Sequence, residues 1–416
     1  MNIGVISTRL AGTDGVSLES AKIVDVAKPF GHEIFYCAGQ LDPELKKRGL
    51  EDRRLHFEDE VAKELHDRAF VHKEAAATLL PDIHKRAAEL KRPLYQFLTE
   101  KQIKYVIIQN AFAIPMQLPL AQALTELMAE LKLPGLAHNH DFYWERPRFL
   151  DSHIEPFLDQ FFPPNLPGLT HATINSLAQT ALKERRGLDS IIIPNVFDFH
   201  TPPPGIDDFN GDFRQAIGLT EDDWLILQPT RVIPRKGIEL SIELLHQLGD
   251  PRAKLVITHK ASDEGPEYLH ELQALAKAKN VRLIYAGEQV DDQRYQDSEK
   301  KIYSLWDAYP HADLVTYPSF IEGFGNALIE TVYFKLPAVV NCYPVYAADI
   351  GPLGFQFAVI DGEITPETVE MVRGWLERPE TAVPPTTHNY ALGQQYFSYR
   401  TLAGLLAPLF KKTSPA

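Results

Sequence analysis

Cysteine is scarce in this sequence of 416 residues, which contains only Cys37 and Cys342. Each lies in an apolar, strand-like run, and neither belongs to a CxxC pair or to another metal-ligand spacing. Free cysteines are among the most buried residues and persist in reducing compartments. We therefore interpret both as buried free thiols.

Long apolar runs are missing as well. No stretch approaches about 18 consecutive apolar residues, the length that a membrane-spanning helix needs. The chain opens on MNIGVIST, which already has the pattern of a strand and lacks a charged leader followed by an apolar run. We expect no transmembrane segment and a cytoplasmic location.

Positive charge is in deficit, because 42 Lys and Arg residues face 56 Asp and Glu residues for a net charge of −14. An acidic surface disfavours nucleic acids and anionic membranes as main partners, although a local basic cleft can still bind phosphates. Apolar residues make up 44% and charged residues 24%, an ordinary soluble balance. A chain of this length usually exceeds one hydrophobic core, so two domains are expected.

The first half alternates short apolar strands with helices. Strands are predicted at residues 2–7, 33–37, 105–110, 135–137, 170–176 and 191–198, and helices over most of 44–102 and at 119–131. The first strand is followed by a glycine loop, a helix that begins at Asp14 or Ser17, and a parallel strand. Ligands bind beyond the carboxyl ends of such strands, so the loop containing Gly12 and Gly15 faces a candidate site.

A polar and aromatic cluster, HNHDFYW, follows the strand at 135–137. A zinc site around His138 and His140 lacks a third and fourth ligand at regular spacing, and one histidine could instead be a satisfied core residue. Arg146 and Arg148 follow, either lining a site for an anionic molecule or forming a solvated face. The candidate acceptor-side residues are Arg9, His138, Asp141, Arg146 and Arg148.

The clearest break in composition is HTPPPGIDDFNGD at residues 200–212, which we interpret as an interdomain linker or as the lead-in to the second domain. A second strand–helix pattern follows it. Strands are predicted at 224–229, 254–258, 281–285, 314–317 and 337–341, and helices at 237–248, 267–279, 300–309 and 325–335. We therefore predict domains at 1–205 and 206–393, and a last helix within 394–416 that crosses back to the first domain.

Two loops of the second half carry the chemistry. TRVIPRKG follows a strand and concentrates Arg231, Arg235 and Lys236, which suits a diphosphate unless it is an ordinary charged loop. Further on, Glu322 and Glu330 bracket a Gly-Phe-Gly turn at a helix start, where amides and the helix dipole attract anions. Carboxylates accept hydrogen bonds from hydroxyl groups. The ligand that best fits this arrangement has an anionic group between two groups that carry several hydroxyls. A nucleotide sugar is such a ligand.

Two other assignments fit these residues less well. The two glutamates are on the order of 10 Å apart at about 1.5 Å per helical residue, whereas paired glycosidase carboxylates lie about 5–9.5 Å apart. The stretch GFGNAL lacks the third glycine of a nicotinamide-binding fingerprint.

PTRVIPRKGIELSIELL followed by PSFIEGFGNALIETVYFKLPAVV resembles the donor-binding half of the retaining GT-B glycosyltransferases of family 4, or glycosyl transferases group 1. The family's signature of two glutamates separated by seven residues is matched by Glu322 and Glu330. The match covers residues 224–345, and the first half matches more loosely through its glycine loop and the HDFYW segment. The resemblance implies an α/β fold of two doubly wound, Rossmann-like domains facing a cleft.

The resemblance also implies roles for individual residues. Arg231 and Lys236 would hold the diphosphate, while Glu330 would bind the ribose. Residues expected at the reacting centre are Arg231, Lys236, Glu322 and His140, with His138 as the alternative histidine. Residues expected against the donor are Gly12, Gly15, Gly323, Phe324, Gly325, Asn326, Ala327 and Glu330.

A front-face mechanism follows for such retaining enzymes, in which the departing diphosphate helps to take the proton of the acceptor hydroxyl. Neither a catalytic base nor a metal or other cofactor is then expected. The donor would be of the GDP-mannose or UDP-glucose type. The run from Gln109 through HNHDFYWERPRF resembles members that act on small solutes, including mannosyl transfer to glucosylglycerate-type acceptors.

The first loop reads GTDGVSLE rather than the family's double-glycine turn, so the resemblance does not define the acceptor pocket. The alternatives are a GT-B nucleotide-sugar epimerase, which would consume donor without an acceptor, and a non-catalytic nucleotide-sugar-binding protein. A monomer or a homodimer is expected.

Overall fold

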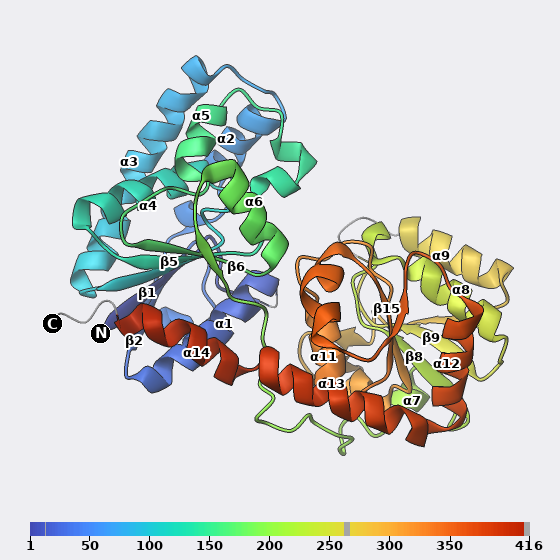
Figure 1. Cartoon of the computed structure of the whole chain (residues 1–416). Helices are drawn as coiled ribbons and strands as arrows, with labels where there is room; N and C mark the ends of the chain where they lie inside the picture. Colours follow the sequence, from blue (N-terminus) through green and yellow to red (C-terminus); the bar gives the residue numbers. More distant parts are fainter. Residues whose placement is uncertain (13, 262–266, 412–416) are drawn as a thin grey trace. The chain divides into compact units, whose positions relative to one another are not determined.

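The computed structural model describes residues 1–12, 14–261 and 267–411, and Figure 1 shows the elements they form. The chain divides into two compact units. Unit 1 contains Met1–Val196 together with the chain from Tyr399, and unit 2 contains Phe197–Ser398.

Unit 1 is built on a parallel sheet in the order β3-β2-β1-β4-β5-β6-β7. Its strands are β1 Asn2–Ile6, β2 Glu33–Ala38, β3 Gly49–Glu51, β4 Tyr105–Gln109, β5 Gly135–Asn139, β6 Leu169–Thr173 and β7 Ser190–Ile192. The strand order changes direction between β1 and β4. Ligands of doubly wound sheets bind outside the carboxyl ends of the strands at such a switch point.

Helices cover both faces of this sheet (Figure 1). They are α1 Gly15–Ala27, α2 Glu60–Phe70, α3 Ala76–Glu100, α4 Leu118–Leu131, α5 Glu155–Phe161, α6 Ser176–Arg186 and α14 Tyr399–Lys411. On one face, α1 and α14 pack on Ile3 and Val5 of β1. On the other face, α2, α3 and α4 pack on alternate residues, including Val106 and Ile108 of β4. Burial on both faces explains the continuous apolar runs of these strands.

Unit 2 repeats the architecture with a parallel sheet in the order β10-β9-β8-β14-β15-β16. Its strands are β8 Trp224–Gln228, β9 Ala253–Ile257, β10 Arg282–Tyr285, β14 Leu314–Tyr317, β15 Ala338–Asn341 and β16 Ala358–Ile360. Its helices are α7 Phe213–Ala216, α8 Ile238–Leu248, α9 Glu267–Ala278, α10 Leu305–Ala308, α11 Asn326–Tyr333, α12 Pro366–Glu377 and α13 Val383–Tyr396. The predicted pair of doubly wound α/β units is confirmed, and the second switch point lies between β8 and β14.

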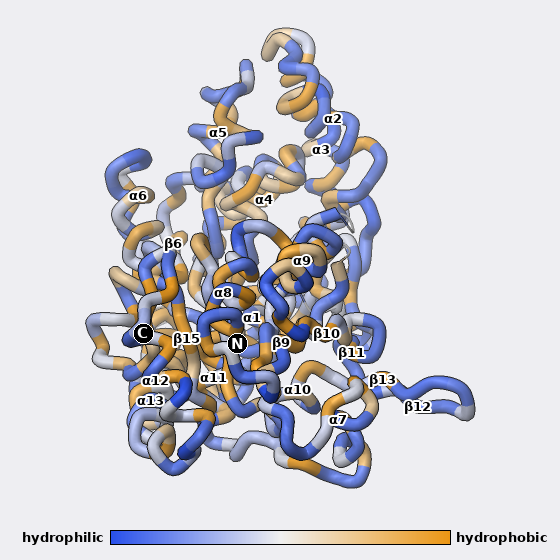
Figure 2. Tube along the Cα trace, turned by 90° about the vertical axis from the view of Figure 1, so that its right-hand side faces the viewer, coloured by the Kyte–Doolittle hydropathy of each residue, from blue (hydrophilic) through white to orange (hydrophobic). Residues whose placement is uncertain are grey.

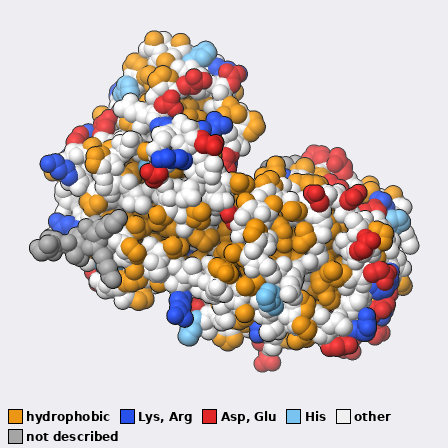
Figure 3. Space-filling model, viewed as in Figure 1, with side chains coloured by type: hydrophobic (Ala, Val, Ile, Leu, Met, Phe, Trp, Pro, Cys, Tyr) orange, Lys and Arg blue, Asp and Glu red, His pale blue; other side chains and the backbone are white. Residues whose placement is uncertain are grey.

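The surface of unit 2 reflects the acidic composition of the chain. On the face shown in Figure 3, Asp and Glu side chains gather over α9 and α12.

A small sheet in the order β11-β13-β12 was not predicted. It contains β11 Val290–Asp291, β12 Tyr295–Gln296 and β13 Lys301–Ser304, and Figure 2 shows its β12–β13 hairpin extending from the rest of unit 2. The helix predicted at 300–309 is therefore wrong over its first half. Ile302 and Tyr303 are buried as neighbours in β13, and only the short α10 follows.

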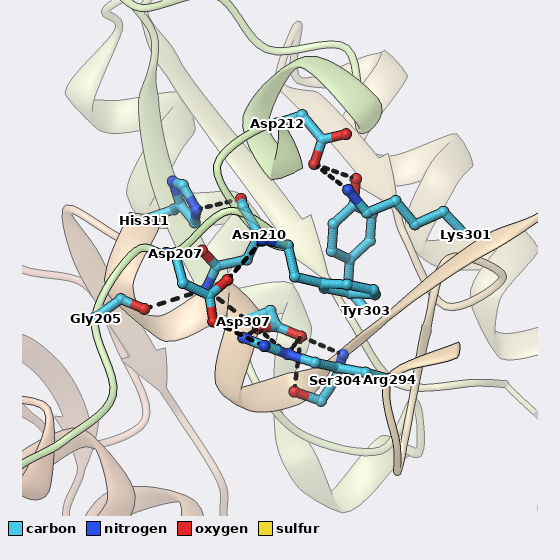
Figure 4. Close-up of polar contacts among 11 residues, drawn as sticks. Gly205, Asp207, Asn210, Asp212, Arg294, Lys301, Tyr303, Ser304, Asp307 and His311 are labelled. Atoms are coloured by element: carbon cyan, nitrogen blue, oxygen red, sulfur yellow. Dashed lines mark hydrogen bonds and ion pairs between the residues drawn. The ribbon is translucent and has the colours of Figure 1, made fainter. Parts of the chain in front are cut away.

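The proline-rich segment at 200–212 is anchored in unit 2 as its lead-in, the second of the two interpretations, and is not an interdomain linker (Figure 4). Asn210 is fully buried and donates a hydrogen bond to Asp307 at 3.1 Å. Arg294, which precedes β12, pairs with both Asp307 and Asp207. These contacts tie the segment to the small sheet.

The first boundary between the units accordingly lies at 196/197 instead of 205/206. Phe197 packs on Tyr333 with ring centroids 4.6 Å apart, and Phe199 packs on Tyr390 at 5.3 Å, so both phenylalanines belong to unit 2. Aromatic packing thus begins unit 2 before the prolines.

The last helix predicted within 394–416 corresponds to α14, which begins at Tyr399, whereas residues 394–396 still belong to α13. α13 packs against α11 within unit 2, whereas α14 packs against α1 within unit 1. Phe397 ends α13 and lies among aromatic rings of unit 2, including Phe324 at 5.2 Å. Cys37 is buried as predicted, but Cys342, just beyond β15, is only partly buried.

The substitution Leu406→Ala tests the contribution of α14 to unit 1. Leu406 is fully buried in the core shared with α1, so we expect unfolding to become easier by about 2–5 kcal/mol. Leu177→Ala on the exposed side of α6 is the matched control, with an expected change below about 1 kcal/mol. Urea denaturation measures both. Equal effects of the two substitutions would contradict the packing of α14.

Candidate active site

Two loops meet at the carboxyl ends of β8 and β14, the switch point of unit 2. The first is the cationic loop, residues 230–237, which follows β8 and ends at α8. The second is the glycine turn, residues 322–326, which follows β14 and leads into α11. The site that the sequence predicts from two distant motifs is therefore one place in the fold, at the position where doubly wound sheets bind ligands.

Hydrogen bonds join the cationic loop to the residues that directly precede the glycine turn. The Phe320 amide donates to the Arg235 carbonyl at 2.9 Å, and the Arg235 guanidinium donates to the Ile321 carbonyl at 2.8 Å. Gly237 has a φ of 60°, and a Cβ at this position would lie 2.4 Å from the carbonyl oxygen of Pro318. Only glycine meets both demands, the left-handed conformation and the close approach.

A buried ion pair lies between the two loops. The Lys236 ammonium contacts the Glu322 carboxylate, and the Arg235 guanidinium lies 3.2 Å from the other carboxylate oxygen. Only 8% of Lys236 is exposed. Burial raises the pKa of Glu322, but Lys236 and Arg235 oppose it and the net pKa is lowered. Glu322 is therefore ionised at neutral pH, and it holds Lys236 in place.

Tyr343 holds the glycine turn in place. The Tyr343 hydroxyl donates to the Phe324 carbonyl at 2.7 Å, and the Phe324 ring is buried. Gly325 has a φ of 128°, and a Cβ there would lie 2.6 Å from the Tyr343 hydroxyl oxygen. The turn thus brings Gly323, Asn326 and Ala327 to the start of α11. The amide groups and positive dipole end of a helix start favour an anion.

Glu330, on α11, is oriented by a tyrosine that sequence reasoning missed. The Tyr309 hydroxyl donates to Glu330 Oε2 at 2.9 Å, and the Tyr309 ring stacks on Phe334 with centroids 4.6 Å apart. Burial, followed by the charge of Glu330, raises the pKa of Tyr309 well above its usual value. Tyr309 therefore stays protonated and donates to a half-buried carboxylate. Because Tyr309 and Glu330 are far apart in the sequence, no local pattern could have predicted this hydrogen bond.

A second missed residue is His259, two positions beyond the end of β9. Burial, followed by the nearby cation of Lys236 and to a smaller extent by that of Arg231, lowers the pKa of His259 to about 4 against the opposing charge of Asp292. The imidazole is therefore neutral at pH 7. Arg231 itself is exposed, at the β8 end of the cationic loop. The ends of three strands, β8, β9 and β14, thus contribute to the site.

In unit 1, the predicted glycine loop contains Asp14, which contacts both α1 and Arg9. Asp14 caps α1 by accepting from the amides of Val16 and Ser17, so the helix begins at Gly15. Arg9 pairs with Asp14 at 3.1 Å. Gly12 has a φ of 75° and donates its amide to Asp42 at 3.2 Å.

The predicted histidines lie together at the end of β5. His138 is buried and its Nδ1 lies 3.0 Å from Gln109 Oε1, while the rings of His138 and His140 are 4.6 Å apart. Burial lowers the pKa of His138 to about 4 and that of His140 well below its usual value. Both imidazoles are therefore neutral, and within the described chain neither Nε2 atom has a hydrogen-bond partner.

Asp141, Arg146 and Arg148, three of the acceptor-side candidates, lie close enough to interact: burial, followed by the cation of Arg146, lowers the pKa of Arg148, and Asp141 opposes this change. Arg146 pairs with Asp141, whereas Arg148 lies over the Phe149 ring at 4.7 Å. Glu145 accepts the Phe142 amide at 2.9 Å, and burial raises its pKa to about 7.

Neither a metal centre nor a membrane-spanning helix is found among the described residues. Among them, no group of three or more His, Cys, Asp or Glu side chains is arranged to hold a metal ion. No helix in the described part of the chain is both long and apolar enough to cross a membrane.

Several known proteins are similar to this chain. The family described as Glycosyl transferases group 1 matches residues 209–352, which include both loops. The chain is 32% identical to a mannosylglucosylglycerate synthase of Petrotoga mobilis, over 86% of each chain. It is 29% identical to a mannosylglucosylglycerate synthase of Thermotoga maritima, over 98% of this chain and 99% of the relative. A solved glycosyltransferase from Rickettsia africae shares the fold with a TM-score of 0.69 at 13% identity, covering 99% of this chain and 98% of its own.

Gly237→Ala tests the contact between the loops. We expect it to lower stability more than Gly249→Ala, because Gly249 has a similar φ of 64° but no atom within 3.8 Å of an added Cβ. Left-handed strain of about 1–2 kcal/mol is common to both variants. Thermal unfolding measures the difference, and an equal loss in both variants would show that the approach to Pro318 is unimportant.

Proposed function

Because the chain belongs to the group 1 glycosyl transferases, we propose that it moves a hexose from a nucleotide-diphosphate sugar, of the GDP-mannose or UDP-glucose type, to a hydroxyl group of a glucosylglycerate-like acceptor, with retention of anomeric configuration. The observation that supports the donor half is the packing of the cationic loop against the glycine turn, around the Lys236–Glu322 pair. The two mannosylglucosylglycerate synthases support the acceptor half, since both match over most of the chain.

Each chemical group of the donor is assigned a binding partner at the switch point of unit 2. The diphosphate is bound by the cations of Arg231 and Lys236 and by the amides at the start of α11. Glu330, whose Oε2 accepts from Tyr309, accepts from the ribose hydroxyls. Glu322 accepts from hydroxyls of the transferred hexose while it fixes Lys236. Each carboxylate thus has at least one protein partner that orients it.

In the proposed transfer, the bond between the anomeric carbon and the diphosphate oxygen breaks as the acceptor oxygen attacks the same face. The acceptor proton passes to the departing diphosphate, so no protein base is needed. The protein contributes position and positive charge, which stabilise the leaving group. His138 and His140 are neutral and belong to unit 1, where we assign them to the sugar and acceptor side.

A transfer assay tests this proposal. Nucleoside diphosphate release from GDP-mannose or UDP-glucose is measured with and without glucosylglycerate, and the disaccharide product is identified by mass. We expect release to depend on the acceptor. Donor consumption without acceptor would favour an epimerase, and binding without consumption would favour a non-catalytic protein.

Lys236→Ala tests the role of the buried cation in the same assay. Loss of one preorganised electrostatic partner of the leaving group lowers kcat by about 10²–10³-fold. Lys254→Ala is the matched control, because Lys254 also pairs with a carboxylate, Asp223 at 3.2 Å, but lies at the amino end of β9. Circular dichroism checks that both variants fold. Full turnover in Lys236→Ala would refute the assignment of the site.

Removal of divalent metals tests the assignment of leaving-group stabilisation to side chains. We propose that Arg231 and Lys236 supply the positive charge, so activity in excess EDTA is expected to stay within about twofold of its value with Mg²⁺. A loss of activity that added Mg²⁺ or Mn²⁺ restores would show that a metal ion shares this role.

A further inference from the structure

Three buried polar atoms without partners belong to loops at the carboxyl edge of the unit 1 sheet, and one of them is on Arg9, beside the glycine loop. They are Nε of Arg9, Nε2 of His56 and Oε1 of Gln117, and none has a hydrogen bond within the described part of the chain. Their residues come from the loops that follow β1, β3 and β4. His56 is 1% exposed and Gln117 2% exposed. Buried polar atoms are rarely left unpaired, because each costs about 1–3 kcal/mol.

Hydrogen bonds and ring contacts hold these residues side by side. The Gln117 amide nitrogen donates to the Arg54 carbonyl at 2.9 Å and to the His56 carbonyl at 3.4 Å. The His56 ring stacks on the Phe57 ring with centroids 4.4 Å apart, and the Arg9 guanidinium lies over the same Phe57 ring at 5.4 Å. The set therefore forms one cluster, seated next to Gly39 at the end of β2, where an added Cβ would strike His56.

The hydrogen-bonding role of each unpartnered atom follows from the bonds its residue already makes. The Glu58 amide donates to His56 Nδ1 at 3.0 Å, so the ring proton of neutral His56 is on Nε2. Burial, followed by the cation of Arg53, lowers the pKa of His56, which keeps the ring neutral. Since the Gln117 nitrogen donates to two carbonyls, its oxygen is the unused acceptor. Arg9 and His56 thus offer donors, and Gln117 offers an acceptor.

We infer that Arg9, His56 and Gln117 form a subsite for the hydroxy-carboxylate end of the acceptor, its glycerate group. A carboxylate accepts from Arg9 and His56, and a neighbouring hydroxyl donates to Gln117 Oε1. Arg9 already shares its charge with Asp14 at 3.1 Å, and this balance suits a single negative charge better than the two charges of a phosphate monoester. The inference rests on the proposed acceptor class for the identity of its ligand.

A matched pair of ligands tests the subsite directly. Glucosylglycerate and glucosylglycerol differ only in that a CH2OH group replaces the carboxylate. Calorimetric titration of the full chain, with and without GDP or UDP, measures the affinity for each in the absence of any sugar donor. We expect glucosylglycerate to bind at least about tenfold more tightly, as a charge-assisted hydrogen bond implies.

The variant Arg9→Ala should abolish this preference, and Arg9→Lys should restore part of it. Arg48→Ala is the matched control, because Arg48 also pairs with a carboxylate, that of Glu33, and also lies over a phenylalanine ring, that of Phe35 at 5.7 Å. Arg48 belongs to a different loop, before β3, and its substitution should leave the preference unchanged. Equal affinity of the wild type for both ligands, or equal effects of Arg9→Ala and Arg48→Ala, would overturn the inference. Competition by inorganic phosphate as strong as that by glucosylglycerate would overturn the hydroxy-carboxylate assignment.

The outcomes of these experiments distinguish an error in the subsite assignment from an error in the proposed function. If glucosylglycerate is a substrate but binds no better than glucosylglycerol, the function stands and the subsite is wrong. If the wild type prefers glucosylglycerate, Arg9→Ala loses the preference, and no hexose is transferred, the subsite stands and the proposed function is wrong.

Discussion

The buried ion pair between Lys236 and Glu322 is the interaction on which the switch-point site depends. An unpaired charge in this position would be costly, and the pair is supported by Arg235, which donates a further hydrogen bond to Glu322 at 3.2 Å. The pair links a loop after β8 to a loop after β14, so each loop fixes the other. Preorganisation of this kind lets a cation act on a leaving group without rearrangement at the moment of reaction.

Glycines and tyrosines also fix the positions of the cationic loop, the glycine turn and Glu330. Gly237 and Gly325 occupy backbone positions with positive φ where neighbouring atoms leave no room for a Cβ. Tyr343 and Tyr309 then hold the turn and Glu330 through single hydrogen bonds. The cations and carboxylates of the site therefore rest on a rigid edge of the unit 2 sheet, and α11 continues that edge.

Local patterns were sufficient to predict the two doubly wound units, most strands, and the meeting of the cationic loop with the glycine turn. Apolar runs, glycines and strand-end charges are local signals, and the predicted family is confirmed by the relatives. Contacts between distant residues were not predictable. His259 and Tyr309 reach the site only through the fold, and β13 was mistaken for helix because Ile302 and Tyr303 suit either element. Composition left residues 200–212 as either a linker or the lead-in to the second domain, and the burial of Asn210 supports the lead-in. The roles assigned to individual site residues stay predictions.

The anomeric configuration of the product tests the central claim most directly, that a leaving group held by cations, without a protein base, directs transfer to the same face of the sugar. NMR spectroscopy of the disaccharide formed from an α-linked nucleotide sugar gives the coupling at the new anomeric centre. An α-linked product is predicted. A β-linked product would require attack from the opposite face and would contradict the account.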